Sequence, residues 1–217
     1  MSNNFHLTRV RIHYHKTQPL RYTGTLDIHK IWERTLRRAR IPLAYSQGFH
    51  PQPRINQALP LPLGLTSRAE LMDIWLEEPC TAEDVLQNLR TTLHPGLVVQ
   101  NINIVALDAP KLQKSVLAAE YSAILLDPIP DLKTRIDQLL AADKLLRQRR
   151  KKTYDLRPLI ETLAILPLDE SGCQCINMRL TASEGATGRA DEVILALSIQ
   201  PHDTRIERTD LHLKPGK

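Results

Sequence analysis

Basic residues alternate with apolar ones near the N-terminus, and this spacing is suited to binding phosphate groups. In the stretch RVRIHYH, Val10, Ile12 and Tyr14 separate side chains that are charged or can become so. Residues two apart project from the same face of a β-strand, so one face is predicted to be apolar and the other basic. Cations on an accessible sheet face hold RNA in several protein modules; a solvated polar surface is the alternative. The basic row consists of Arg9, Arg11, His13 and His15.

A second basic group follows at helical spacing. Residues 27–40 have apolar side chains at positions that share one helix face, which predicts an amphipathic helix that Asp27 can cap. The opposite face is predicted to be exposed and to lie near the basic strand. Its cations are Lys30, Arg34, Arg37, Arg38 and Arg40.

A third basic group lies within residues 145–156 and is denser. Consecutive like charges repel one another unless a phosphate or an acidic surface neutralises them. A solvated hairpin edge, where lysine blocks pairing with another strand, is the alternative. Arg157 differs because apolar residues surround it, so Asp155 or Glu161 is expected to pair with its guanidinium group. The run consists of Arg147, Arg149, Arg150, Lys151 and Lys152.

The loop AYSQGFHPQPRI follows the predicted helix and is stiff. Its two prolines fix backbone angles, and Gly48 allows a turn that other residues adopt only at a cost. A simple connection would need those residues but not the polar and aromatic side chains between them. Since ordered loops of this kind often carry function, the loop is predicted to present a binding site made of Ser46, Phe49, His50 and Arg54.

Metal and catalytic chemistry have weaker support. His13 and His15 share a strand face but have no acidic or cysteine partner at a recognised metal-binding spacing. Cys173 and Cys175 lack a second pair and are expected to be core thiols. We therefore predict no metal, no cofactor and no catalytic residue. A general acid–base role for His13 or His50 in RNA cleavage stays chemically open.

Composition bounds the class of protein. The 217 residues carry 29 Lys and Arg against 24 Asp and Glu, which gives a formal net charge of +5. Such a mild excess is common among nucleic-acid-binding proteins. No apolar run approaches the roughly 20 residues of a membrane helix, and three cysteines without disulfide spacing suit a reducing compartment. The sequence predicts a cytoplasmic protein that does not enter a membrane.

The elements that would position these residues occur twice in a similar order. The first half has predicted strands at 7–14, 55–61, 70–77 and 97–105 and helices at 27–40 and 81–93. The second half has predicted strands near 120–126, 173–182 and 204–213 and helices at 131–141 and 190–199. The order β-α-β-β-α-β is that of a ferredoxin-like fold. We therefore predict an α+β protein of two tandem ferredoxin-like halves, residues 1–105 and 118–217, joined by a linker at 106–117.

The chain also resembles the radical-SAM-linked proteins, a bacterial family whose domain is also found fused to the C-terminal end of radical S-adenosylmethionine (SAM) proteins. The resemblance lies in LD…RTLRRA, PLAYSQGF with two following prolines, LPLPLG, KTYDLRPLI and RIERTDL. Two positions depart from the family pattern. Gly24-Thr25 stands where the family has serine-histidine, so chemistry assigned to that histidine is absent, and Arg189-Ala190 stands where the family has an Arg-Pro pair.

The resemblance implies association with a radical SAM protein. The chain itself cannot be that enzyme, because its three cysteines lack the C-x3-C-x2-C spacing that holds the iron–sulfur cluster. The physical pattern adds a basic surface and a stiff loop, which suit a module that recognises a substrate while the radical enzyme supplies the chemistry.

Three functions are compatible with these patterns. The preferred one is a non-catalytic accessory protein that binds RNA, or an RNA-containing assembly, for a radical SAM partner. The second is a protein-docking module whose basic surface meets an acidic partner without nucleic acid. The third is an RNA-processing endonuclease, suggested by architecture alone. The predicted RNA or partner contacts are Arg9, Arg11, His13, His15, Arg34, Arg37, Arg38, Ser46, Phe49, His50, Arg54, Arg147, Arg149, Lys151, Lys152 and Arg157.

Overall fold

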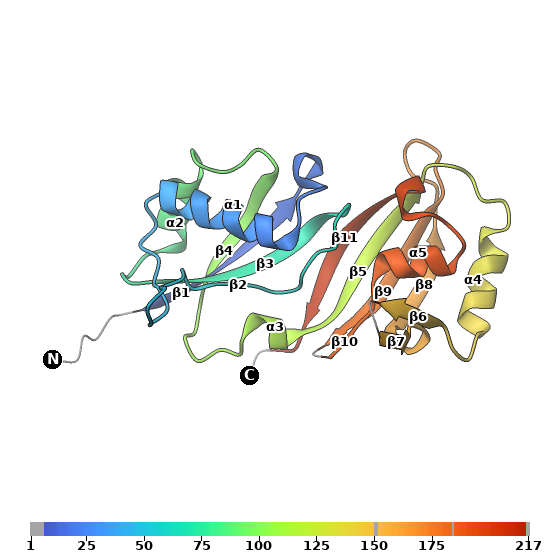
Figure 1. Cartoon of the computed structure of the whole chain (residues 1–217). Coiled ribbons are helices and arrows are strands. Elements are labelled where there is room, and N and C mark those ends of the chain that lie inside the picture. Colours follow the sequence, from blue (N-terminus) through green and yellow to red (C-terminus); the bar gives the residue numbers. More distant parts are fainter. Residues whose placement is uncertain (1–6, 150–151, 184, 216–217) are drawn as a thin grey trace. The chain divides into compact units, whose positions relative to one another are not determined.

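The computed structural model of the chain describes residues 7–149, 152–183 and 185–215 (Figure 1). Strands and helices alternate along it, so the predicted α+β class is confirmed. The chain divides into two compact units, Met1–Ser115 and Val116–Lys217, which are called unit 1 and unit 2 below. Among the described residues, no helix is long and apolar enough to cross a membrane.

Unit 1 contains an antiparallel sheet in the strand order β2-β3-β1-β4. Its strands are β1 (Thr8–Lys16), β2 (Ile55–Gln57), β3 (Thr66–Leu76) and β4 (Leu97–Val105). The central strand β1 places Arg11 opposite Asp73 of β3 and Asn103 of β4. Strand β2 is shorter than the predicted 55–61, since Pro60 and Pro62 have no backbone N–H to donate to a ladder.

Two helices of unit 1, α1 (Thr25–Arg38) and α2 (Ala82–Leu89), cover one face of this sheet (Figure 1). Their apolar residues form one core with those of β1, β3 and β4, and Trp32 is fully buried with its ring 4.8 Å from that of Tyr14. Helix α1 begins after Gly24 without a side-chain cap, so Asp27 lies in the first turn and does not cap it as predicted. Helix α2 has the predicted start, where Thr81 and Asp84 form a reciprocal capping box.

The other face of the unit 1 sheet is partly covered by the segment that was predicted to be a linker. Residues Leu112–Ser115 form a short helix, α3, which contacts β2 and β3. Leu112 is completely buried there. The next strand begins directly afterwards at Val116. The sequence 106–115 therefore closes part of a sheet face that was predicted to be open.

Unit 2 has an antiparallel sheet in the order β11-β5-β9-β8, and β10 pairs with a later stretch of β9. Its buried apolar residues include Ile136 and Val193, from the two helices. The elements are β5 (Val116–Leu125), α4 (Leu132–Ala141), β8 (Ile160–Leu166), β9 (Cys175–Ser183), β10 (Ala186–Thr187), α5 (Ala190–Ala196) and β11 (Thr204–Leu213).

The described residues of the basic stretch 145–156 lie mainly on two paired strands, which are called the basic hairpin below. Its strands, β6 (Leu146–Arg149) and β7 (Lys152–Asp155), pair antiparallel and place Arg149 opposite Lys152. Three 3-10 turns complete the described elements, each with a proline in its first two positions: η1 (Gln18–Leu20), η2 (Arg157–Leu159) and η3 (Pro201–Asp203).

Candidate nucleic-acid interface

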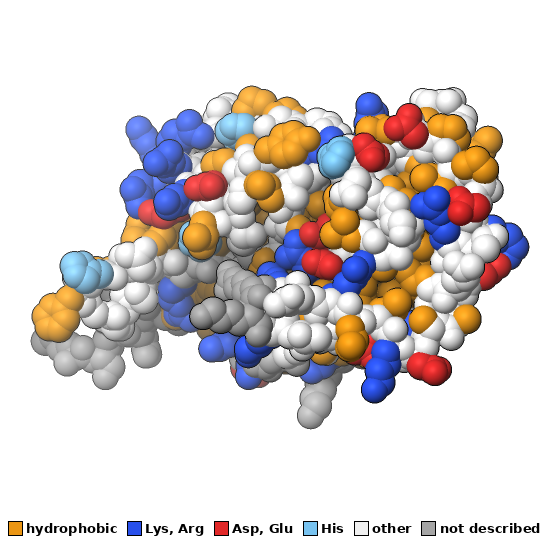
Figure 2. Space-filling model, turned by 45° about the vertical axis from the view of Figure 1, so that its right-hand side comes forward, with side chains coloured by type: hydrophobic (Ala, Val, Ile, Leu, Met, Phe, Trp, Pro, Cys, Tyr) orange, Lys and Arg blue, Asp and Glu red, His pale blue; other side chains and the backbone are white. Residues whose placement is uncertain are grey.

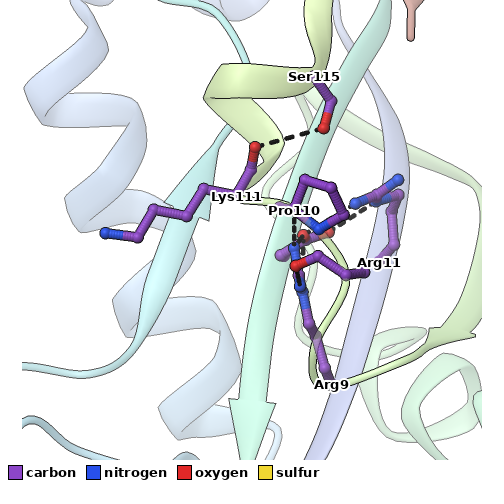
Figure 3. A network of polar contacts seen from close by, with 7 residues as sticks. Arg9, Arg11, Pro110, Lys111 and Ser115 are labelled. Atoms are coloured by element: carbon purple, nitrogen blue, oxygen red, sulfur yellow. Dashed lines mark hydrogen bonds and ion pairs between the residues drawn. The ribbon is translucent and has the colours of Figure 1, made fainter. Parts of the chain in front are cut away.

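Arg9 and Arg11, which are labelled in Figure 3, share one buried carboxylate, that of Asp73. Arg9 donates to Asp73 Oδ2 from Nη2 at 2.6 Å and from Nε at 3.0 Å, and Arg11 donates to the same side chain at 2.7 and 3.0 Å. Arg9 also donates to the backbone oxygens of Ala109 and Pro110 at 2.6 and 2.8 Å. Asp73 has no exposed surface, so the three charged groups form a structural cluster on the sheet.

Arg9 was predicted to line an open surface, but the structure places it in the interior. Its side chain is 2% exposed, because the segment that contains Ala109 and Pro110 closes over it. The guanidinium carbon also lies 5.0 Å from the ring centre of Trp75, and that of Arg54 lies 4.8 Å from the same ring. Arg9 thus stabilises the fold, whereas Arg11 and Arg54 keep partial exposure.

The rest of the basic row on β1 is half-buried and polar. Burial, and secondarily the charge of Arg11, lowers the pKa of His13 below its ordinary value, while Asp73 acts in the opposite direction. His13 is therefore mainly neutral at pH 7 and offers hydrogen bonds instead of a positive charge. Asn101 of β4 lies opposite His13 and is exposed. This part of the face can hydrogen-bond a ligand but contributes less charge than predicted.

The outer face of α1 carries four of the basic side chains that the helical spacing predicted, and all are exposed: Lys30, Arg34, Arg37 and Arg38. Arg40 is also exposed but lies beyond the end of the helix, with a φ of 55°. Figure 2 shows Lys and Arg side chains gathered at the upper left of the view, on the side where unit 1 carries its helices. Residues three and four positions apart on a helix are neighbours, so Lys30, Arg34, Arg37 and Arg38 form one exposed basic patch.

A groove of about 450 Å³ runs beside this helix face. It is lined by Arg34, Arg37 and Arg38, by Ile31 of the same helix, and by His94 from the α2–β4 loop. The contacts leave most donors open, since Arg37 Nη2 bonds Glu33 Oε1 at 2.6 Å and Arg38 Nη2 bonds the backbone oxygen of Thr92 at 3.2 Å. The groove is therefore a concave, cation-rich site within unit 1.

Sequence reasoning missed His94 as a groove residue. The stretch His94-Pro95-Gly96 predicted only the end of a helix. No sequence spacing links position 94 to positions 34–38, because the α2–β4 loop meets α1 only through the tertiary fold.

The loop between α1 and β2 is closed by its own hydrogen bonds and presents an exposed tip. The backbone N–H of Ser46 donates to Gln52 O at 2.8 Å, and that of Gln52 donates to Ser46 Oγ at 3.0 Å. Gly48 adopts a φ of 131° at the tip. Phe49 is 102% exposed and His50 is exposed beside it. Ser46 thus holds the loop together, while Phe49 and His50 are the side chains that it presents.

The basic hairpin of unit 2 divides into bound and free cations. Arg147 donates to the backbone oxygen of Glu192 at 3.2 Å and lies 3.8 Å from its carboxylate. Arg149 and Lys152 are exposed and line a groove of about 950 Å³ together with Tyr154. The two remaining predicted cations of the run, Arg150 and Lys151, lie outside the described residues.

Arg157 has a structural role that differs from the predicted ion pair. Its side chain donates to the backbone oxygen of Leu140 at 2.9 and 3.1 Å and to that of Ile160 at 3.4 Å. Asp155 instead accepts from the backbone N–H groups of Leu145 and Arg157 at 2.8 and 3.0 Å. Glu161 pairs with Arg179 at 2.9 Å. Two backbone carbonyls therefore take the place of the expected carboxylate.

Each unit thus has its own group of predicted contact residues. In unit 1 the structure brings together Arg34, Arg37 and Arg38 on one surface and Arg11, His13 and Arg54 on another. Unit 2 holds the exposed pair Arg149 and Lys152. His15 is half-buried on β1, where its Nδ1 lies 3.5 Å from Gln100 Nε2. Within the described parts of the chain, no group of three His, Cys, Asp or Glu side chains could hold a metal ion.

Comparison with known proteins gives one family and distant structural likenesses. The family model described as "Uncharacterized protein conserved in bacteria (DUF2344)" matches residues 9–190. No protein with a curated description matches the sequence.

Two solved structures illustrate the likenesses. The structure of an H/ACA RNP bound to a substrate RNA containing 2'-deoxyuridine has a chain with 10% identity and a TM-score of 0.38; the match covers 87% of this chain and 43% of that one. This chain thus spans less than half of the length of that one. A "putative glycine cleavage system transcriptional repressor" has 12% identity and a TM-score of 0.25, with 93% and 96% covered. Likenesses this distant carry no argument about function.

Proposed function

The chain belongs to the DUF2344 family of proteins conserved in bacteria, and we propose that it is a non-catalytic accessory protein that binds RNA for a radical SAM partner. The observation that carries the proposal is the exposed basic face of α1 with its adjoining groove. Arg34, Arg37 and Arg38 lie within little more than one helical turn and line the same concavity. Cations of this density attract a phosphate backbone and release its counterions on binding.

A purely structural reading accounts for only part of this surface. Arg37 and Arg38 lie in the last turn of α1, where cations favourably oppose the helix dipole. Arg34 lies one turn earlier, and it forms no hydrogen bond or ion pair with another described residue. His94 comes from a different element. Helix stabilisation therefore does not explain why these side chains converge on one groove, whereas RNA binding does.

The exposed loop tip supports the same proposal. RNA modules combine a cationic surface with aromatic side chains on which bases stack. Phe49 is fully exposed on a loop whose base is closed by hydrogen bonds, so little conformational entropy is lost when a base stacks on it. Phe49 is the stacking residue in this proposal, and the α1 cations contact the phosphates.

The association with a radical SAM protein rests on the sequence motifs, and an exposed apolar patch of unit 1 offers it a docking surface. Tyr22, Leu26 and Leu63 are 73%, 79% and 63% exposed. Arg21 and Gly64 fix the two segments that carry them, because Arg21 Nε donates to Gly64 O at 2.7 Å and Gly64 N donates to Arg21 O at 3.1 Å. Exposed apolar groups held in this way are typical of protein contacts.

The same patch favours a second candidate function, a protein-docking module without nucleic acid. Nuclease treatment of a co-purified complex with the radical SAM protein separates the two candidates. If the complex survives the nuclease and Leu26→Ser with Leu63→Ser abolishes it, the patch is the docking surface. RNA binding by the isolated chain is then decided by the α1 variants.

We also infer that each unit is a ferredoxin-like half. In unit 1 the elements β1-α1-β2-β3-α2-β4 give a sheet of order β2-β3-β1-β4, and in unit 2 the elements β5-α4-β8-β9-α5-β11 give β8-β9-β5-β11. Both orders follow the split βαββαβ arrangement. Free cysteines at Cys80, Cys173 and Cys175 support a cytoplasmic location.

The test of RNA binding is a fluorescence-anisotropy titration with a short single-stranded RNA of mixed sequence. The double variant Arg34→Glu, Arg38→Glu is compared with Lys133→Glu, Arg205→Glu, which makes the same change in net charge at exposed positions of unit 2. We expect the α1 variant to lose at least about tenfold in affinity, since charge-assisted contacts contribute roughly 1.5–3 kcal/mol each, while the control stays close to the wild type. If the two variants lost equal amounts of RNA affinity, the loss would be an effect of net charge alone, and the proposed site would be contradicted.

A further inference from the structure

We propose that the groove beside α1 binds the terminal phosphate of an RNA chain, a phosphate monoester; this inference rests on the proposed RNA binding. Its lining combines three guanidinium groups and one imidazole around the apolar side chain of Ile31. All four polar groups are donors to an anion, and no carboxylate is among the described lining residues. The site is thus built for a compact group with several acceptor oxygens.

The imidazole of His94 is oriented for this role by a backbone contact. The N–H of Gly96 donates to His94 Nδ1 at 3.0 Å. An Nδ1 that accepts a hydrogen bond carries no hydrogen, so the neutral ring must carry its hydrogen on Nε2. Nε2 is therefore the donor that His94 offers to a ligand in the groove.

Arg37 and Arg38 are each held by a hydrogen bond but keep further N–H donors for a ligand. One hydrogen bond from Nη2 fixes Arg37 to Glu33, and another fixes Arg38 to the backbone oxygen of Thr92. A guanidinium group has five N–H donors, so each arginine has others left for a phosphate oxygen. Arg34, which forms no hydrogen bond or ion pair with another described residue, can turn its guanidinium group toward the same oxygens.

The charge of the lining favours a terminal phosphate over an internal one. Arg34, Arg37 and Arg38 line one groove together with His94, so their donors can reach a single anion. A monoester carries roughly −1.5 to −2 charges near pH 7, whereas an internal diester carries one. Three guanidinium groups therefore discriminate in favour of the chain end.

The size of the groove fits this ligand. About 450 Å³ lies within the range of sites that enclose one small molecule, and it holds a terminal nucleotide. Ile31 provides the apolar contact for the sugar or base. The remaining nucleotides would continue past the groove along Lys30 of α1 or along Arg40, which follows the helix end.

The experiment compares three versions of one short single-stranded RNA: with a 5′-phosphate, with a 3′-phosphate, and with hydroxyl groups at both ends. Free AMP is the competitor that distinguishes a nucleotide from an RNA end. The variants are Arg34→Gln and His94→Asn; asparagine can still accept the Gly96 N–H but lacks a group at the Nε2 position. Arg90→Gln, an exposed arginine outside the groove lining, is the matched control.

We expect one phosphorylated RNA to bind at least about tenfold more tightly than the hydroxyl-ended RNA, as one or more charge-assisted hydrogen bonds are gained. Arg34→Gln and His94→Asn should reduce that ratio toward one, and Arg90→Gln should leave it unchanged. Displacement of the RNA by AMP at comparable concentration would assign the site to a nucleotide end. Equal, tight binding of all three RNAs would overturn the terminal-phosphate site but not RNA binding, whereas no binding of any RNA would overturn both.

Discussion

Removing the carboxylate of Asp73 should strongly destabilise unit 1. Asp73 has no exposed surface and accepts hydrogen bonds from Arg9 and Arg11 across adjacent strands. In Asp73→Asn the side chain keeps its shape but loses its charge, so Arg9, 2% exposed, becomes a buried cation without an anionic partner. Breaking a buried pair on one side costs about 3–5 kcal/mol of unfolding free energy. The backbone oxygens of Ala109 and Pro110 offset only part of this cost.

Tryptophan fluorescence during urea unfolding measures the loss directly. Both tryptophans of the chain, Trp32 and Trp75, lie in unit 1, so the signal reports on that unit. With an m-value of about 1–3 kcal/mol per molar urea, the midpoint should fall by roughly 2 M. Glu83→Gln removes the same charge from an exposed side chain whose partner atom on Arg90 lies 4.0 Å away. It should change the unfolding free energy by less than about 0.5 kcal/mol.

Single arginine variants separate the contributions of Arg9 and Arg11 to the unfolding free energy. Arg9→Met should cost more than Arg11→Met, because Arg9 alone bonds the 106–115 segment and is the more deeply buried of the two. A loss below about 1 kcal/mol for Asp73→Asn, or the reverse order for the two arginines, would refute the claim that this cluster stabilises the sheet and its cover.

Three other outcomes follow from single positions. In Phe49→Ala, the unfolding free energy should stay within about 0.5 kcal/mol of the wild type. RNA affinity should fall about 5- to 100-fold in anisotropy titrations, because stacking on an aromatic side chain contributes roughly 1–3 kcal/mol per base. An unchanged affinity would show that Phe49 is not part of the interface. In Gly96→Ala, the new Cβ would collide with the side chain of Leu20. The unfolding free energy measured by tryptophan fluorescence should therefore fall by about 1–3 kcal/mol. An unchanged unfolding midpoint would show that the Leu20 side chain moves aside without a cost in stability. Hydrogen bonds from the backbone N–H of Leu145, and secondarily that of Arg157, lower the pKa of Asp155; its contribution to stability is therefore complete above the unfolded pKa of about 3.9 and is lost as the pH falls through the lower folded value. Urea unfolding followed by circular dichroism across acid pH should show a flatter profile for Asp155→Asn than for the wild type or for Asp143→Asn, and three parallel profiles would contradict this assignment.

Local sequence patterns predicted the helices and strands better than they predicted the tertiary contacts that these elements make. Period-two alternation found β1, and helical spacing found α1 with its exposed cations. Both are properties of adjacent residues, which local periodicity reports directly. The start of the helix predicted at 81–93 was found for the same reason, and Thr81 caps it in the structure.

The errors concern contacts between distant parts of the chain. Arg9 was expected to be exposed, but its partner Asp73 lies 64 residues away and its cover near Ala109 lies 100 residues away. Alternation shows which face a side chain is on, but it does not show what covers that face. His94 and the carbonyl partners of Arg157 were missed for the same reason, since they meet their partners only after folding.

The salt dependence of RNA binding tests the central claim most directly. For a single-stranded RNA, the logarithm of the association constant should fall linearly with the logarithm of salt concentration, with a slope of about −0.7 for each phosphate neutralised. Neutralisation of a terminal phosphate that carries nearly two charges predicts a slope of about −1.4 or steeper for the wild type with a phosphate-ended RNA. The slope of the Arg34→Glu, Arg38→Glu variant should be clearly shallower. An identical slope for the two proteins, or no binding at low salt, would contradict the assignment of the α1 face as the RNA-binding surface.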